Sequence, residues 1–171
     1  MEFMKLIEER HSTRAYQEKA VEQDKLEKIL HAANRAPSAG DLQAYSIVVV
    51  RKPDLRQALV KAAVDQQFVG QAPVVLVFLA DPARSGEKYG HRGEGLYAIQ
   101  DAAIACAYAQ LAAHDLGLSA CWVGAFRKKD VQEVVGGAEG HVPVSLLTIG
   151  YAAESPFVTP RRPLTEMVRE A

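Results

Sequence analysis

The chain has 171 residues, of which 49% are hydrophobic and 24% are charged, and its formal net charge is −1. This length and composition are typical of a folded protein with a substantial core, and we expect residues 1–171 to form a single domain. The near-zero net charge excludes any overall electrostatic reason to expect binding to nucleic acid or to an anionic membrane.

Several kinds of site lack support in the sequence. Two cysteines, Cys106 and Cys121, are too few for a disulfide framework, so a reducing cytoplasm is the expected location. The N-terminus has no apolar signal segment, and the apolar stretch 96–116 carries Gln100 and Asp101, so we expect no membrane span. The histidines are scattered without metal-ligand spacing. No GxGxxG follows a strand and no GxxxxGKS/T occurs, which disfavours a Rossmann unit and an ATPase.

Helical periodicity predicts a short first helix from Phe3 to just before the arginines. In the segment that follows, Arg10, Ser12 and Arg14 alternate, so an extended conformation would aim all three to one side. Two guanidiniums and a hydroxyl suit a phosphate. An exposed basic turn is the simpler interpretation when the segment is considered alone.

A second amphipathic helix is predicted over 26–33, and it should stop at Ala36 because Pro37 disfavours helix at the residue before it. The loop that follows carries a hydroxyl at Ser38, a carboxylate at Asp41 and an amide at Gln43. These groups could form hydrogen bonds to a planar polar ligand. An ordinary turn with local hydrogen bonds fits the same composition.

Apolar strands are predicted over 47–50 and 74–80, with a helix beginning at Pro53 between them. The second strand is uninterrupted and should lie centrally in a sheet. The stretch Arg84–Gly95 is rich in glycine and charge, so we predict a mobile loop that is either a substrate-access lid or a disordered surface loop.

Residues 96–116 predict a long alanine-rich helix that is apolar nearly all round and is capped by Gly117. Such a helix must be enclosed, either in the core of one chain or between two chains. Strands over Ser119–Val123 and Val144–Ile149 follow, with a short helix between them and another from Leu164. Cys121 is expected to be a buried inert thiol. Helices alternating with about four apolar strands would, unaided, suggest a parallel α/β sheet.

Four motifs in order resemble the nitroreductase family of FMN-dependent oxidoreductases: RHSTRAY at 10–16, RAPSAGDLQAY at 35–45, LSACWVGAF at 118–126 and PRRPL at 160–164. The resemblance covers essentially the whole chain. It implies an α+β fold with a mostly antiparallel central sheet flanked by helices. It also implies an intertwined homodimer around the long alanine-rich helix, with flavin sites at the interface. We follow this resemblance rather than the parallel alternative.

The resemblance also implies which residues bind FMN. They are Arg10, His11, Ser12, Arg14, Pro37, Ser38, Ala39, Asp41, Gln43, Val123, Gly124, Arg161 and Arg162. Arginines from both chain ends would surround the phosphate, unless 161–162 is only a solvated basic tail. Main-chain groups at 123–124 would meet the ring near its reactive nitrogen. No side chain is implied as an acid or base, so no catalytic residue is assigned.

The implied activity is that of an enzyme in which NAD(P)H reduces the flavin, leaves, and a nitroaromatic, quinone or enone acceptor takes the electrons. A flavin-binding storage or sensing module without steady turnover and a dehalogenase-type enzyme are alternatives on the same scaffold. Asp41 is the main departure, because the family usually has an asparagine there. An ionised aspartate cannot donate a hydrogen bond, and its charge opposes that of the reduced flavin. Ala44-Tyr45 likewise replaces the commoner Pro-Trp.

Overall fold

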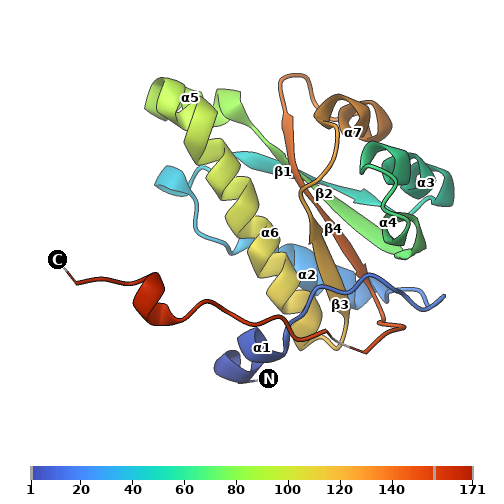
Figure 1. Cartoon of the computed structure of the whole chain (residues 1–171). Coiled ribbons are helices and arrows are strands. Elements are labelled where there is room, and N and C mark those ends of the chain that lie inside the picture. Colours follow the sequence, from blue (N-terminus) through green and yellow to red (C-terminus); the bar gives the residue numbers. More distant parts are fainter. Residues whose placement is uncertain (1, 156, 171) are drawn as a thin grey trace.

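The computed structural model describes residues 2–155 and 157–170 and has a four-stranded sheet with helices on both faces (Figure 1). The strand order is β1 (Tyr45–Val50), β2 (Val74–Ala80), β4 (Val142–Gly150) and β3 (Ser119–Val123). All three neighbouring pairs are antiparallel. The parallel sheet suggested by element alternation is therefore wrong, and the antiparallel α+β arrangement implied by the resemblance is confirmed.

Two groups of helices cover the two faces of the sheet (Figure 1). One face carries α2 (Gln23–Asn34) and α6 (Ala98–Asp115), and the other carries α3 (Pro53–Ala62), α4 (Phe68–Gln71) and α7 (Lys128–Val135). The remaining helical elements are α1 (Phe3–Glu9), α5 (Pro82–Arg92), the π-helical turn η2 (Gly93–Tyr97) and two 3-10 turns, η1 (Ala39–Asp41) and η3 (Leu164–Glu166).

The core lies on both sides of β2, every residue of which is buried. Leu76 and Phe78 pack with α2 and α6, while Val75 and Val77 pack on the opposite face with α3 and α4. Each such side chain contributes about 1.5–3 kcal/mol when it is fully buried. The uninterrupted apolar run therefore reflects a strand with helices on both faces, as the sequence predicts.

Helix α6 is enclosed on one side only within a single chain. Its buried face consists mainly of alanines, which let the helix approach the sheet closely. On the opposite side Ile99, Ile104 and Tyr108 are 38%, 36% and 41% exposed. Gly117 follows the helix with φ +75°, as expected for a left-handed cap. Within residues 2–155 and 157–170, no helix is long and apolar enough to cross a membrane.

The prediction of a loop over Arg84–Gly95 is wrong, because this stretch is helical in α5 and η2. The helix begins at Pro82, and the Asp81 side chain caps it by accepting a hydrogen bond from the Arg84 N–H at 3.1 Å. Gly90 interrupts the helix with φ 54° and ψ −146°. Asp81-Pro82 thus starts a helix as well as ending a strand.

Candidate functional site

The segment after α1 is fixed along the outer edge of the sheet. Ser12 forms a parallel bridge with Ala120 of β3, and the Thr13 N–H donates to the Ala120 carbonyl at 3.2 Å. Farther along, Tyr16 forms an antiparallel bridge with Ala152, just after β4. The start of the chain is therefore held beside the segment that leads into its C-terminal tail.

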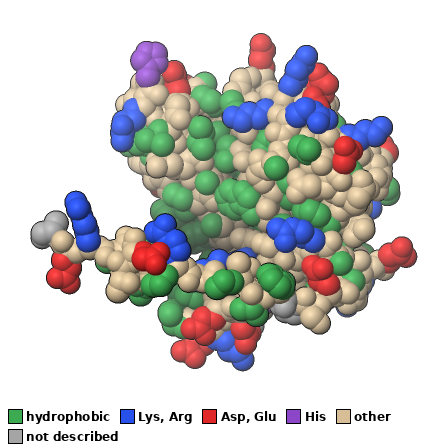
Figure 2. Space-filling view, in the orientation of Figure 1, with side chains coloured by type: hydrophobic (Ala, Val, Ile, Leu, Met, Phe, Trp, Pro, Cys, Tyr) green, Lys and Arg blue, Asp and Glu red, His purple; other side chains and the backbone are tan. Residues whose placement is uncertain are grey.

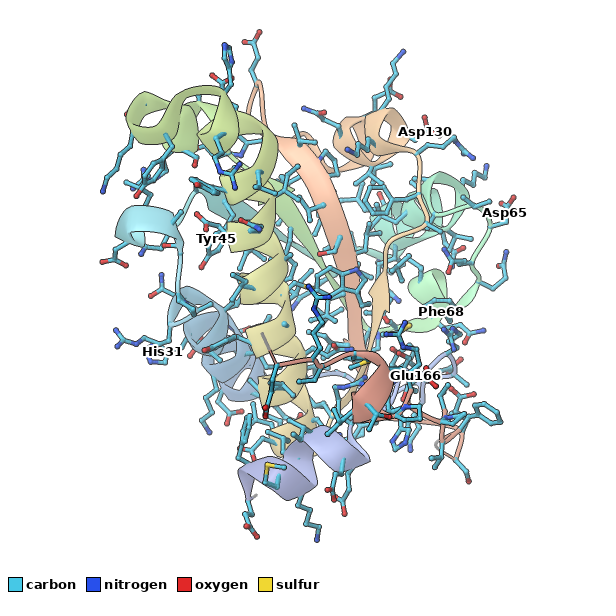
Figure 3. All side chains as sticks on the ribbon, turned by 60° about the vertical axis from the view of Figure 1, so that its left-hand side comes forward. His31, Tyr45, Asp65, Phe68, Asp130 and Glu166 are labelled. Carbon is cyan, nitrogen blue, oxygen red and sulfur yellow. The ribbon has the colours of Figure 1, made fainter. Side chains whose placement is uncertain are left out.

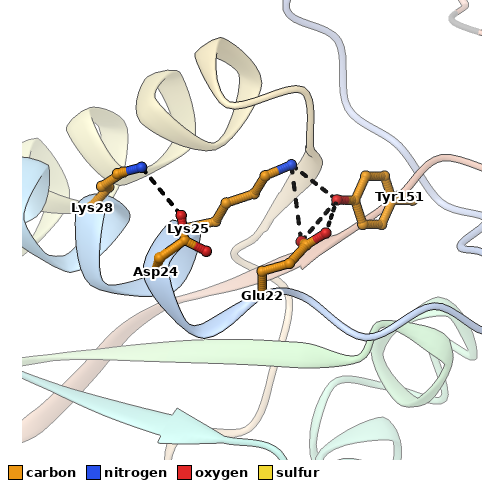
Figure 4. A network of polar contacts seen from close by, with 5 residues as sticks. All are labelled: Glu22, Asp24, Lys25, Lys28 and Tyr151. Carbon is orange, nitrogen blue, oxygen red and sulfur yellow. Dashed lines mark hydrogen bonds and ion pairs between the residues drawn. The ribbon is translucent and has the colours of Figure 1, made fainter.

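A polar network strengthens this junction (Figure 4). The Tyr151 hydroxyl donates to both carboxylate oxygens of Glu22 at 2.7 and 2.8 Å, and Lys25 Nζ donates to the same hydroxyl at 2.9 Å. The ammonium of Lys19 lies 3.7 Å from the centre of the Tyr151 ring. Exposed ion pairs contribute only about 0–1 kcal/mol each, so the network mainly orients the two segments.

A cavity of about 510 Å³ opens where the two chain ends meet. Five of the residues predicted to bind FMN line it: Arg10, His11, Ser12, Arg14 and Arg161. The remaining lining residues are Ile7, Glu8, Phe157, Val158 and Thr159. The cavity thus combines three guanidiniums and two hydroxyls with one carboxylate.

The electrostatics of this cavity favour an anion. Burial and the nearby charge of Arg161 lower the pKa of the half-buried Arg10 guanidinium. Like charges held this close repel one another, and a bound dianion would relieve that repulsion. Arg162 does not line the cavity, and its side chain pairs instead with Glu166 of the tail, Nε lying 3.9 Å from Oε2. Of the four arginines predicted to surround the phosphate, three therefore line this cavity.

The edge of β3 leads from this cavity to Val123 and Gly124. Gly124 is four residues beyond Ala120, a span of about 13 Å in extended chain. A Cβ added to Gly124 would come no nearer than 3.7 Å to another atom, Trp122 Nε1, so the surface there is open. β3 is the edge strand, and residues 12–13 pair with it at Ala120, so the backbone groups available to a ligand are those nearer Gly124. Cys121 is buried in this strand, and burial raises the pKa of its thiol, as expected for an inert cysteine.

The loop that contains Pro37, Ser38, Ala39, Asp41 and Gln43 has an unusual backbone. Gly40, Asp41 and Gln43 have φ values of 59°, 57° and 45°. For the two residues other than glycine, this left-handed region is strained, and such strain gathers at ligand sites. The Ser38 hydroxyl accepts hydrogen bonds from the backbone N–H of Gln43 at 3.0 Å and from its side-chain amide at 3.3 Å, and that amide also donates to Asp41.

The loop lies toward the start of α6, and α1, whose end lines the cavity, lies toward the other end of that helix (Figure 1). The loop contacts the helix at Asp101, through hydrogen bonds from the Ala39 and Ala44 N–H groups. Arg10, beside the cavity, is close enough to His114 to act on its pKa, which burial lowers. Residues 101 and 114 are separated by about 20 Å along a helix. A single chain therefore does not bring the two parts of the predicted flavin site together.

Sequence reasoning missed two features of this region. Residues 157–159 line the cavity although their sequence carries no recognisable phosphate motif. Asp101 was interpreted only as evidence against a membrane span, yet its side chain is 2% exposed. An aspartate within an alanine-rich, apolar helix was the available signal, because buried carboxylates need partners. In the described part of the chain, no group of three or more histidine, cysteine, aspartate or glutamate residues is placed to hold a metal ion.

Comparison with known proteins gives a consistent result. Residues 7–69 and 61–151 match the nitroreductase family. An NADH dehydrogenase from Thermus thermophilus is 32% identical, with 93% of this chain and 91% of the relative covered. An FMN reductase [NAD(P)H] from Bacillus subtilis is 30% identical, with 95% and 70% covered. The solved structure of an NADPH:FMN oxidoreductase from Vibrio harveyi in complex with NAD+ superposes with a TM-score of 0.89 at 26% identity, covering 98% and 76% of the two chains.

Proposed function

This chain belongs to the nitroreductase family, and we propose that it is an FMN-dependent oxidoreductase that oxidises NAD(P)H and reduces a small organic acceptor of the nitroaromatic, quinone or enone type. The observation that carries the proposal is the cavity in which Arg10, Arg14 and Arg161 meet from the two ends of the chain. Three guanidiniums that share one cavity favour an anion, and a flavin phosphate fits that preference.

The other residues also fit FMN. In this proposal the three arginines and the Ser12 hydroxyl bind the phosphate, and the open edge of β3 near Gly124 receives the polar edge of the ring. When bound, FMN supplies the hydride and electron-transfer chemistry. The role of the chain is to anchor the phosphate, orient the ring and place backbone donors where negative charge develops on reduction.

A homodimer would complete the site. The loop with Ser38 and Gln43 lies about 20 Å along α6 from the phosphate cavity of its own chain. A second copy with its α6 running antiparallel would bring its loop next to that cavity. We therefore propose that each flavin is bound by the cavity and β3 edge of one chain and by the loop of its partner.

The surface supports this assembly. An apolar groove of about 410 Å³ lies between α1 and the second half of α6, lined by Phe3, Leu6, Tyr108 and Leu111 among others. Figure 2 shows apolar side chains gathered on the face that α6 crosses, and the C-terminal tail standing away from the body. In that tail Leu164, Met167 and Val168 are exposed. Exposed apolar patches of this kind mark protein interfaces, and a second copy would cover both the helix and the tail.

The test is an absorbance spectrum of the purified protein, with and without added FMN, followed by anaerobic addition of NADH or NADPH. We expect flavin bands that bleach with at least one nucleotide and recover with a quinone or nitroaromatic. Bleaching without steady turnover would instead favour a storage or sensing module. A protein that binds no FMN after reconstitution would refute the proposal and return the three arginines to the role of surface residues.

A further inference from the structure

A buried carboxylate on α6 contacts the flavin loop at both of its ends. Asp101 is 2% exposed and lies among alanines on the face of α6 that packs against the core. Its Oδ1 accepts a hydrogen bond from the Ala39 N–H at 2.9 Å, and its Oδ2 accepts one from the Ala44 N–H at 3.3 Å. Burying an ionised carboxylate is costly unless such donors compensate it.

The two amides lie on either side of the strained residues. Between Ala39 and Ala44 the chain passes through Gly40, Asp41 and Gln43, all of which have positive φ. Such a conformation persists only where the surroundings hold it. The Asp101 side chain therefore restrains both ends of the segment. Neither end can relax without losing a hydrogen bond to a buried charge.

Other contacts restrain the loop from the side of α5. Arg84 Nε donates to the Leu42 carbonyl at 2.5 Å, and a Cβ added to Gly40 would collide with the Tyr89 hydroxyl. These groups are exposed or half-buried, whereas Asp101 is shielded from solvent. Tyr45, beside α6 in Figure 3, follows directly and donates its hydroxyl to the Ala33 carbonyl at 2.9 Å, so the loop is also fixed where it enters β1.

We propose that Asp101 is a positioning residue for the flavin: its carboxylate holds residues 38–44 in the strained form that presents Ser38, Asp41 and Gln43 to the ring. The inference rests on the proposed function, because it assigns the loop to a flavin. It adds that the geometry at the ring depends on a residue that does not touch the ring. In the proposed dimer, Asp101 of one chain would set the flavin environment of its partner.

The chemistry of the side chain suggests the variant. Asp101→Asn keeps the size of the side chain but replaces one acceptor oxygen with an NH2 group that faces an N–H donor. Asp24→Asn is the matched control, since it removes the same charge from an exposed residue that pairs with Lys28 on α2. If Asp101→Asn fails to fold, Ala39→Pro tests the same hydrogen bond from the other side. Ser38 is already extended at φ −139°, ψ 158°, and Ala39 is the first residue of η1, so proline is compatible there.

The first measurement is amide hydrogen exchange by NMR on the flavin-free protein. We expect the Ala44 N–H in Ala39→Pro, and the Ala39 and Ala44 N–H groups in Asp101→Asn, to exchange at least about tenfold faster than in the wild type, because a hydrogen bond to a buried charge is lost. Amides in β2 and in the Asp24→Asn control should not change. Unchanged exchange rates at both loop amides would refute the proposal that Asp101 restrains the loop, whether or not the protein binds FMN.

The second measurement is the FMN dissociation constant and the flavin midpoint potential. We expect Asp101→Asn to lower the FMN affinity about tenfold and to shift the flavin midpoint potential. The double variant with Ala39→Pro should lose no more FMN affinity than the weaker-binding single variant, because both changes act on the same hydrogen bond. A purely structural role would lower thermal stability and leave the potential of the bound flavin unchanged. Faster exchange of the loop amides with unchanged FMN affinity and midpoint potential would refute the proposal that Asp101 positions the loop for the flavin. A wild-type protein that binds no FMN would instead refute the proposed function.

Discussion

Replacing Arg161 with glutamine should weaken FMN binding, whereas the same change at the next residue should not. Arg161 lines the cavity and its charge acts on Arg10, while Arg162 pairs with Glu166 outside the cavity. A hydrogen bond to a charged group contributes about 1.5–3 kcal/mol, and each 1.4 kcal/mol is a factor of about ten in affinity. Because Arg161 is exposed, screening by solvent favours the lower end, so we expect a loss of about tenfold.

The assay is a fluorescence titration of flavin-free protein with FMN and, in parallel, with riboflavin. Riboflavin lacks the phosphate, so its affinity should be the same in the wild type and in Arg161→Gln. The FMN deficit should also shrink as salt is raised, since the lost interaction is electrostatic. Equal losses in Arg161→Gln and Arg162→Gln, or an equal loss for riboflavin, would refute the assignment of this cavity to the phosphate.

Three further predictions concern the loop, the assembly and the core. Asp41→Asn should raise the flavin midpoint potential, because it removes a negative charge beside the reduced ring; an unchanged or lower potential in an anaerobic redox titration would contradict this. Co-expression of differently tagged Arg10→Gln and Gln43→Ala chains should yield a mixed dimer with one intact site and about half the wild-type flavin content. If the loop instead bound the flavin in the cavity of its own chain, the mixed dimer would have no intact site. Burial raises the pKa of Tyr16, whose hydroxyl hydrogen-bonds to the Thr13 carbonyl and Thr148. The unfolded chain loses this proton near the usual pKa of about 10 while the folded chain keeps it, so stability should fall as pH rises above about 10. Tyr16→Phe should lack this component in denaturant titrations and be less stable by about 1–3 kcal/mol at pH 7; parallel pH profiles would show that the interpretation is wrong.

Strands and most helices could be predicted because their signals are local. The apolar run at 74–80 became the buried β2, and the alanine-rich stretch became α6. The direction of strand pairing could not be derived from periodicity, because hydrophobic runs look alike in parallel and antiparallel sheets once both faces are covered. The family resemblance, carried by four ordered motifs, supplied that information.

The grouping of side chains around the cavity was predictable where the residues are close in sequence. Arg10, Ser12 and Arg14 share one cavity because the segment runs extended along β3, as their alternation suggested. The separation of Arg161 from Arg162 was not predictable, since it depends on where the tail lies and on the pairing with Glu166. The role of Asp101 depends on contacts 57 and 62 residues away in sequence, which no local pattern reports.

The wrong prediction for α5 and the unrecognised role of Asp101 concern the same loop. As a helix, α5 carries Arg84 to the Leu42 carbonyl and places Tyr89 and Lys88 against Gly40, while α6 holds the other side of the loop through Asp101. A mobile loop at 84–95 could not restrain its neighbour in this way. The strained residues Asp41 and Gln43 are therefore held from two helices, which is the rigid support that the proposed ring-binding segment requires.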